Sequence, residues 1–213
     1  MNSSTQPKSS SPPSNDKPDK AKAILAGALQ VFTTQGYAAA SMDRIASAAG
    51  VSKPTLYRYF QDKERLFIVL IQELMQDKTQ LILNLQTRPD LNIPPDKVLH
   101  QIATFLLEDI SHKKPIMTLM RLIIGESERF PQLAQTFVRE IERPLFEALS
   151  FYLESHPQLQ LPDPMVAARI FAGSLVHYLI VQNLMQGSEI LPLESDRMVD
   201  GLIQMIMSAG DNK

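Results

Sequence analysis

The 213-residue sequence contains no cysteine and no tryptophan, and only 8 of its residues are glycine. Without cysteine the chain cannot form disulfides, thiolate nucleophiles or cysteine-ligated metal sites. The alternation of apolar and polar residues that is typical of half-buried strands is also missing. Leu, Ile, Ala, Met, Gln and Glu dominate instead, and these residues favour helices. We therefore expect an all-α fold.

The motifs of the common enzyme classes are missing too. The sequence has no nucleophile elbow, no Walker loop and no glycine-rich dinucleotide motif. Its histidines do not show the paired i, i+4 spacing of a metal-binding helix; they are His100, His112, His156 and His177. We therefore expect no catalytic residue, no metal site and no resident cofactor.

Long apolar runs are not evident along the chain. We expect no segment of the roughly 20 apolar residues that a membrane-spanning helix needs, and no apolar core of a signal peptide near the first residue. These absences favour a cytoplasmic protein without a membrane partner. Residues 1–18 are rich in Ser, Pro, Asn and Lys and contain too few apolar residues to form a core, so they are predicted to be a disordered tail.

The charge is unevenly distributed. The whole chain has a formal net charge of −2, but residues 17–65 carry eight basic and four acidic side chains, a net charge of +4. Since residues 1–16 are neutral, the remainder carries −6. A basic N-terminal part on an acidic remainder suits electrostatic steering toward phosphates by one end of the molecule, although small charge differences between segments are common.

Residues 41–60 predict two short helices joined by a tight turn. Ser41 and Ser52 are suited to cap the two helices, and Gly50 is suited to a left-handed turn residue between them. Apolar residues at i, i+3, i+4 and i+7 mark the buried face of the first helix; they are Met42, Ile45, Ala46 and Ala49. Leu56 and Phe60 mark that of the second.

The second helix exposes hydroxyl, guanidinium and aromatic groups from Thr55, Tyr57, Arg58 and Tyr59. Such groups bond phosphate oxygens and base edges, so the pattern favours a helix that lies in the major groove of DNA. The alternative is an ordinary helical hairpin with a solvated polar face.

The residues on both sides of 41–60 favour the DNA-binding interpretation over the ordinary helical hairpin. An amphipathic helix is expected over residues 21–34, ending at Gly36-Tyr37, and Asp62 can cap a helix that begins near Lys63. At this point the sequence resembles the tetracycline-repressor (TetR) family of bacterial transcription regulators. The matching pieces run in order over residues 20–67: Phe32…Gly36-Tyr37, Ile45-Ala46, Ala49-Gly50-Val51-Ser52, Thr55-Leu56-Tyr57-Arg58-Tyr59-Phe60 and Lys63-Glu64…Leu66.

The resemblance implies roles for individual positions. Tyr57 and Lys63 match phosphate-contacting positions, whereas Thr55 and Tyr59 match positions that reach bases or the backbone. Asp43 departs from the base-reading arginine of some members, so base reading is expected to fall on the second helix. The full set expected to contact DNA is Ser41, Arg44, Ser52, Lys53, Thr55, Tyr57, Arg58, Tyr59 and Lys63.

Beyond this head (residues 19–65), residues 66–213 are predicted to form a helical domain for ligand binding and dimerisation. Prolines and capping residues divide the chain into helices at about 63–86, 96–111, 115–124, 131–153, 164–186 and 195–209, which makes about nine helices in all. Pro144 falls inside the fourth of these, so a kink or a break is expected there. The segment from Arg121 to Pro131 resembles one branch of the family, the regulators with an AefR-like C-terminal domain.

An effector pocket is expected in this domain because adaptable methionines and isolated polar groups interrupt otherwise apolar helices. The candidate lining residues are Phe105, Met117, Met120, Arg121, Phe171, His177 and Tyr178. Methionines at helical spacing are, however, more often part of a core.

The last two predicted helices carry more apolar surface than one core requires, which favours a subunit interface. The candidate interface residues are Ile170, Gly173, Ser174, Leu202, Met205 and Ile206. In the resembled family these helices pair across a two-fold axis, although some of the residues must serve the core of the single subunit.

The resulting hypothesis is a one-component switch. A homodimer binds a palindromic double-stranded operator and represses transcription, and an unidentified small-molecule effector releases it. The competing interpretation is a helical adaptor that uses the same hairpin for protein contacts. Salt separates the two, because DNA binding weakens steeply with ionic strength through counterion release.

Overall fold

The computed structural model describes residues 16–87 and 93–210, and every regular element in those ranges is helical. The predicted all-α fold is therefore confirmed. The predicted tail lies outside the described residues, except for residues 16–18. These three residues belong to the first helix, so the expected disorder is wrong for them.

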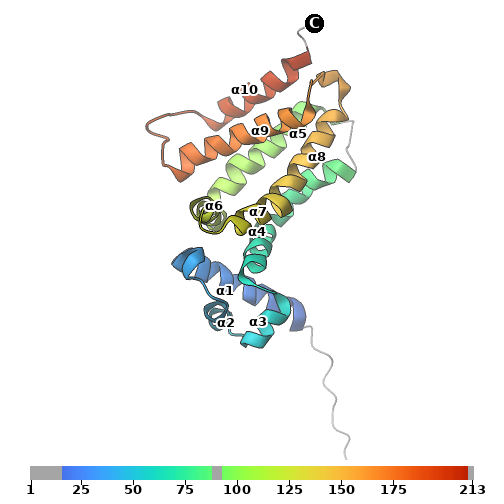
Figure 1. Cartoon of the computed structure of the whole chain (residues 1–213). Helices are drawn as coiled ribbons and strands as arrows, with labels where there is room; N and C mark the ends of the chain where they lie inside the picture. The colour runs from blue at the N-terminus through green and yellow to red at the C-terminus, as the bar shows by residue number, and fades with distance from the viewer. Residues whose placement is uncertain (1–15, 88–92, 211–213) are drawn as a thin grey trace, which may run out of the picture.

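Three helices form a head at one end of the molecule (Figure 1). They are α1 (Asp16–Ala39), α2 (Met42–Ala48) and α3 (Lys53–Tyr59). The first helix is longer than predicted, and its helical dihedrals are interrupted at Gly36 (φ 78°, ψ 169°). The predicted end at Gly36-Tyr37 thus appears as an interruption rather than as a terminus.

The predicted turn between α2 and α3 is present. Ser41 Oγ accepts from the backbone N–H of Arg44, and Ser52 Oγ accepts from that of Thr55, each at 3.3 Å. Gly50 has the left-handed φ of 64° that a side chain would disfavour. Leu56 is fully buried beneath α3, as its spacing predicts.

Seven further α-helices complete the described chain, so the structure has ten where the sequence predicts about nine. They are α4 (Lys63–Thr87), α5 (Pro95–Thr104), α6 (Lys114–Glu126), α7 (Pro131–Phe137), α8 (Arg143–Glu154), α9 (Pro164–Leu179) and α10 (Ser195–Met207). In Figure 1, α4 rises from the head into the body, and α9 and α10 lie on one side of the body.

Three π-helical segments follow or join these α-helices. The segments are η1 (Phe105–Ile110) after α5, η2 (Val138–Glu142) between α7 and α8, and η4 (Ile180–Leu184) after α9. The interruption that Pro144 predicts is η2. Proline lacks the N–H that an unbroken α-helix would donate to the carbonyl four residues earlier, so the helix widens just before it.

Two of the predicted caps have different outcomes. Asp163 Oδ1 accepts from the backbone N–H of Val166 at 3.0 Å, so the predicted cap of α9 is confirmed. Asp96 does not cap α5, because that helix begins one residue earlier, at Pro95, after an N-cap position occupied by Pro94.

The helix α4 is shared by two apolar cores. Its first turns contribute Leu66 and Phe67 to a head cluster that also contains Phe32 and Ile45. Its later turns contribute Ile82 and Leu85 to a body cluster. The head cluster continues into α6 and α7 through buried residues of the body, namely Leu119, Ile123, Leu133 and Phe137. Head and body are therefore joined by the continuous helix α4 and packed together through α6 and α7.

One segment of the body is long and apolar enough to cross a membrane by length and composition. It is Pro164–Leu184, which comprises α9 and η4 and has a mean hydropathy of 1.5 over its most apolar window. The expectation that no such run exists was wrong, since scattered polar residues such as Arg169 and His177 mask the length of the segment. Only 22% of that window is buried within the chain.

The packing of α1 on the α2–α3 turn depends on the missing side chain of Gly27. A Cβ at this position would lie 2.7 Å from the backbone nitrogen of Ala49. We expect Gly27→Ala to destabilise the protein by about 1–3 kcal/mol through overpacking, measured as the urea midpoint at fixed protein concentration. Gly125→Ala is the control, because no atom lies within 4 Å of its Cβ; it should stabilise by roughly 0.5–1 kcal/mol. Equal midpoints for the two variants would contradict this packing.

Candidate functional site

The outward face of α3 presents Lys53, Tyr57 and Arg58 to solvent. Tyr57 is 45% exposed, a high value for an aromatic side chain on a helix of the head. Thr55 is half-buried, and its hydroxyl lies 2.8 Å from that of Ser52. The predicted combination of a cation, an aromatic hydroxyl and a guanidinium on one surface is thus present.

Tyr59 does not belong to that face. Its ring packs against the head cluster, and its hydroxyl is buried without a hydrogen-bond partner among the described residues. Arg58 lies over this ring, with its guanidinium carbon 5.6 Å from the ring centroid. The prediction that Tyr59 reads bases is therefore not supported by this geometry. A helical repeat of about 100° per residue placed Tyr59 at the edge of the buried face, and packing turned it inward.

Two further predicted contacts are engaged within the head. Arg44 Nη1 donates to Gln35 Oε1 at 2.7 Å and to the carbonyl of Ala39 at 2.9 Å, at the end of α1. Lys53 Nζ lies 2.7 Å from Asp43 Oδ1, and the hydrogen bond to this carboxylate raises the pKa of Lys53. Because these side chains are exposed, their bonds are weak enough to exchange for phosphate.

Lys63 is held more firmly than the other cations. Its ammonium donates to the carbonyls of Tyr37 at 2.8 Å and Ala40 at 3.0 Å, and lies 4.3 Å from the centroid of the Tyr37 ring. Burial lowers its pKa. The ring of Phe130, before α7, lies on the same ammonium at 5.7 Å. A contact between Lys63 and phosphate stays a prediction. In the structure, Lys63 joins α1, α4 and the body.

The next two residues of α4 also bind the body. Glu64 Oε1 accepts from the hydroxyl of Thr136 at 2.6 Å, and Arg65 forms an ion pair with Glu140. The first turn of α4 is thus tied to α7 and η2 by side chains on consecutive positions. We call this set of contacts the junction; it comprises Lys63, Glu64, Arg65, Phe130, Thr136 and Glu140.

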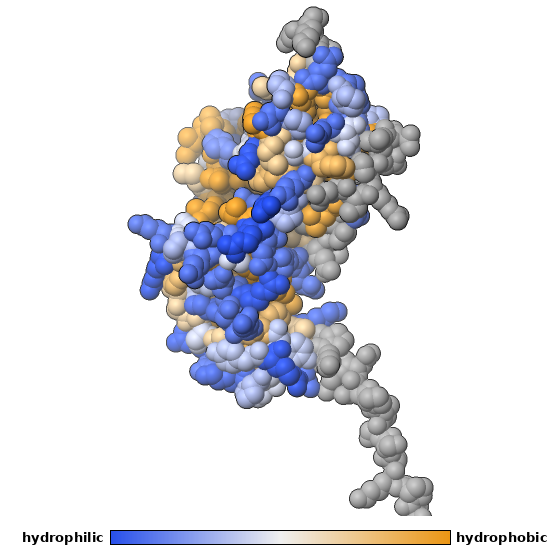
Figure 2. All heavy atoms as spheres, turned by 45° about the vertical axis from the view of Figure 1, so that its right-hand side comes forward, coloured by the Kyte–Doolittle hydropathy of each residue, from blue (hydrophilic) through white to orange (hydrophobic). Residues whose placement is uncertain are grey.

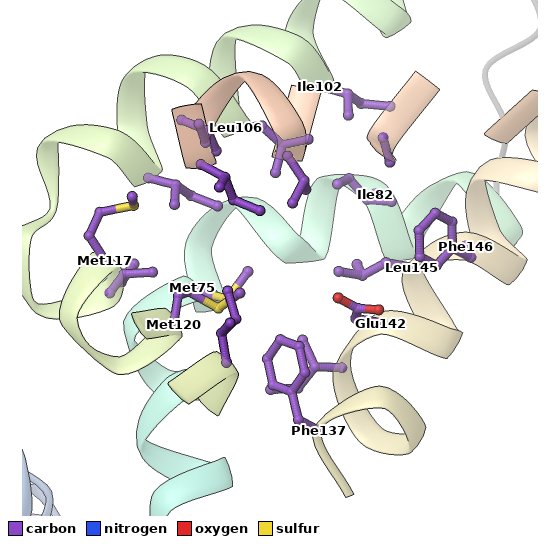
Figure 3. Close-up of a pocket in the computed structure, with 18 of the residues that line it drawn as sticks. Met75, Ile82, Ile102, Leu106, Met117, Met120, Phe137, Glu142, Leu145 and Phe146 are labelled. Carbon is purple, nitrogen blue, oxygen red and sulfur yellow. The ribbon is translucent and has the colours of Figure 1, made fainter. Parts of the chain in front are cut away.

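Directly beside the junction lies an apolar cavity of about 140 Å³ (Figure 3). Its walls come from α4, α5, α6, α8 and α9 and from all three π-helical segments. Phe137, Ile141 and Glu142 line it from α7 and η2, the same stretch that holds Thr136 and Glu140 of the junction. The stretch of α7 and η2 thus lines the cavity and also binds the first turn of α4.

Two of the seven residues predicted to line a pocket, Met117 and Met120, line this cavity. Tyr178 lines a second, more polar pocket instead, and the other four line neither. Phe105 and Phe171 are buried in the body core. Arg121 is exposed and donates to the carbonyl of Leu184, His177 is exposed, and the Tyr178 hydroxyl donates to the carbonyl of Leu193.

Sequence reasoning missed the wall formed by α4, η2 and α8. Met75 comes from α4, and Leu145 and Phe146 come from α8 (Figure 3). The break at Pro144 was a usable signal, because π-helical turns are frequent at functional sites. Glu142 is the only titratable residue among the described residues that line the cavity.

The residues predicted to form the subunit interface differ in how far their side chains are exposed to solvent. Ile170 is 53% exposed and Met205 is 69% exposed, and Gly173 has open space beside it. Ser174 is half-buried. Leu202 and Ile206, in contrast, are buried in the core of the single subunit and offer little surface to a partner, so their assignment to an interface stays a prediction without support from this geometry. They share α10 with Met205 but lie on its inner face.

Within the described residues no group of three His, Asp or Glu side chains is placed to hold a metal ion. In Figure 2 the surface of the head is mostly hydrophilic, and the larger hydrophobic areas lie on the body.

Two family models match the chain. Residues 24–70 match the bacterial regulatory proteins of the tetR family. Residues 97–209 match the C-terminal domain of AefR-like transcriptional repressors. Among curated relatives, the HTH-type transcriptional regulator YvkB of Bacillus subtilis (strain 168) is 27% identical over 185 residues, which cover 84% of this chain and 90% of the relative.

Solved structures of similar regulators have the same fold as this chain. A TetR-family transcriptional regulator from Mesorhizobium loti superposes with a TM-score of 0.70 at 24% identity, covering 92% of this chain and 98% of that one. The flavonoid-responsive regulator FrrA superposes with a TM-score of 0.66 at 29% identity, covering 89% and 96%.

The inward position of Tyr59 leads to a direct test. A buried hydroxyl without a partner costs free energy, so we expect Tyr59→Phe to leave the urea midpoint unchanged or to raise the free energy of unfolding by up to about 1 kcal/mol. Ser52→Ala is the comparison, since loss of this cap should cost about 1 kcal/mol. A loss of stability in Tyr59→Phe that equals the loss in Ser52→Ala would place the Tyr59 hydroxyl in a bonded environment instead.

Proposed function

Because the chain belongs to the TetR family of bacterial regulatory proteins and carries an AefR-like C-terminal domain, we propose that it is a ligand-responsive repressor that binds a palindromic operator as a homodimer. The observation that carries this proposal is the junction. It connects the exposed face of α3, by way of α4, to the wall of an apolar cavity. A DNA-binding surface, a pocket and a physical link between them are the parts that such a switch requires.

In this proposal α3 enters the major groove, and Tyr57 and Arg58 make the principal contacts. Both are exposed on α3, next to the exposed Lys53. Ser41 and Ser52, whose hydroxyls accept from backbone N–H groups, lie at helix N-termini, which suit phosphate binding. Thr55 contributes once its hydroxyl leaves Ser52. Arg44 and Lys53 contact phosphates by exchanging their present partners.

The homodimer follows from the exposed apolar face of α9 and α10. Val166, Ile170 and Gly173 follow each other at i, i+4 and i+7 along α9, and Met205 lies exposed on α10. A helix this apolar with so little of its surface buried needs a partner. A second copy of the chain supplies an identical face, as an isologous two-fold contact requires. Such a dimer presents two α3 helices to the two half-sites of a palindrome.

Release of DNA follows from the cavity. A small apolar effector that fits the cavity better in the non-DNA state shifts the equilibrium toward that state, by no more than its difference in affinity. Displacement of η2 acts on Thr136 and Glu140, and through them on Glu64 and Arg65 of α4. The similar protein FrrA responds to flavonoids, which is consistent with an apolar organic effector. The protein would act in the bacterial cytoplasm.

The second candidate, a helical adaptor without DNA binding, has no observation that favours it over the first. It predicts binding that depends little on salt.

The DNA contact is tested with Arg58→Ala on an operator selected from a random DNA pool. We expect operator affinity to fall by roughly 1–3 kcal/mol, and the slope of log affinity against log salt to fall by about 1 if the contact is to phosphate. Arg121→Ala is the matched control, because it removes the same charge from an exposed position on the body. Unchanged affinity and slope in Arg58→Ala would contradict the assignment of α3.

The dimer is tested by placing acidic groups on the exposed apolar face. We expect the wild-type protein to sediment as a dimer, and the double variant Ile170→Asp with Met205→Glu as a monomer, because the interface would bury two unpaired charges per subunit. Val138→Asp is the control, since Val138 is 51% exposed and lies outside α9 and α10. A monomeric wild type, or a double variant that remains dimeric, would rule out this interface.

A further inference from the structure

The cavity has an unusual charge pattern for its size. Its described lining is almost entirely Ile, Leu, Met, Phe, Val and Ala, and no lysine, arginine or histidine is among the described lining residues. Glu142 is the single exception. A lone carboxyl group on an apolar wall is costly unless something satisfies it, so its presence calls for an explanation.

The position of Glu142 is fixed by the backbone. It is the last residue of η2 and directly precedes α8. In Figure 3 its carboxyl group lies among the cavity residues, near Leu145 and above Phe137. The wider π-helical turn changes the direction of side chains relative to an α-helix, and here it places this carboxyl group on the cavity side.

No side chain in the described residues forms a hydrogen bond or an ion pair with Glu142. Burial raises the pKa of its carboxyl group, and the positive charge of Arg169 on α9 offsets part of that effect. The Arg169 guanidinium lies over the Phe146 ring, with its central carbon 5.6 Å from the centroid. The carboxyl oxygens are thus available as hydrogen-bond acceptors for a molecule inside the cavity.

The size of the cavity limits that molecule. About 140 Å³ is close to the volume of an engineered cavity, roughly 150 Å³, that accepts one benzene ring. The flexible side chains of Met75, Met117 and Met120 line the cavity (Figure 3) and can adapt to different outlines. This volume matches a molecule of about one ring with a short substituent.

We infer that Glu142 selects the effector: the cavity takes a compact apolar molecule, about one ring in size, that carries a hydrogen-bond donor such as a hydroxyl or an ammonium group, and it rejects carboxylates. This inference rests on the proposed function. A donor satisfies the half-buried carboxyl group, whereas an anion is repelled by it and finds no cation among the described lining residues.

Three probes that share a phenylethyl group test the selection. They are 2-phenylethanol, 2-phenylethylamine and 3-phenylpropionate, which end in a hydroxyl, an ammonium and a carboxylate. Their affinities for the free protein are measured by calorimetry, and their release of the selected operator by fluorescence anisotropy. We expect the alcohol and the amine to bind at least about tenfold more tightly than the carboxylate, the factor that one hydrogen bond to a charged group supplies.

Two variants assign that preference to Glu142. In Glu142→Gln, which keeps the shape and one acceptor oxygen, the amine should lose about tenfold in affinity and the carboxylate should gain. In Glu142→Leu the advantage of both donors should disappear. The control is Glu147→Gln, since Glu147 is bound to Arg143 at 2.7 Å and is not among the cavity residues. It should keep the wild-type order.

The outcomes separate this inference from the proposed function. If the wild type binds no operator, the proposed function fails, whatever the probes do. If operator binding is intact but 3-phenylpropionate binds as tightly as the other two probes, the inference alone is overturned. It is also overturned if none of the probes binds, or if Glu142→Gln keeps the wild-type order of affinities. Operator binding by each variant without a probe confirms that the variant is folded.

Discussion

The burial of one helix, α4, in two apolar cores is the constraint on which the rest of the structure depends. Leu66 and Phe67 belong to the head and Ile82 and Leu85 belong to the body (Figure 1), and α6 packs beside α4 with buried residues in both clusters. Because packed interiors have few voids and deform little, the head cannot change its orientation without a rearrangement along α4. The side-chain contacts of the junction then decide which way α4 is held.

Two cations of the head have two possible partners, the carbonyl groups at the end of α1 and the phosphates of DNA. The carbonyls at the end of α1 need donors, because the last carbonyls of a helix have no partner within it. Arg44 and Lys63 supply them. These are two of the cations that the family resemblance assigns to DNA. The same side chains therefore serve the internal order of the head and are candidates for phosphate contact. If Lys63 contacts phosphate as the resemblance implies, its affinity for DNA depends on the arrangement of α1, α4 and Phe130.

The parts of the structure that depend on local rules could be predicted from the sequence. The caps at Ser41, Ser52 and Asp163, the left-handed Gly50 and the interruption before Pro144 each depend on a few adjacent residues. The errors concern which face of a helix meets which neighbour. Tyr59 lies at the edge of a stripe, where a small rotation decides between solvent and core. Likewise, the apolar residues Leu202 and Met205 lie three positions apart on one helix, yet the first is buried and the second is exposed, and composition alone does not separate them.

The cavity could not be located for a related reason: its lining depends on departures from the α-helical repeat. The π-helical segments η1, η2 and η4 contribute Leu106, Glu142 and Ile180, among others. In each segment the extra residue per turn shifts the faces that follow, so a periodicity of 3.6 assigns the wrong side chains to the interior. The same departure places the cavity next to the head. A regular α-helix from Pro131 to Glu154 would have to accommodate Pro144 by breaking. With η2 in place, Thr136 and Glu140 reach α4 while Phe137, Ile141 and Glu142 face the cavity, so one short segment both lines the cavity and binds the head, as the proposed switch requires.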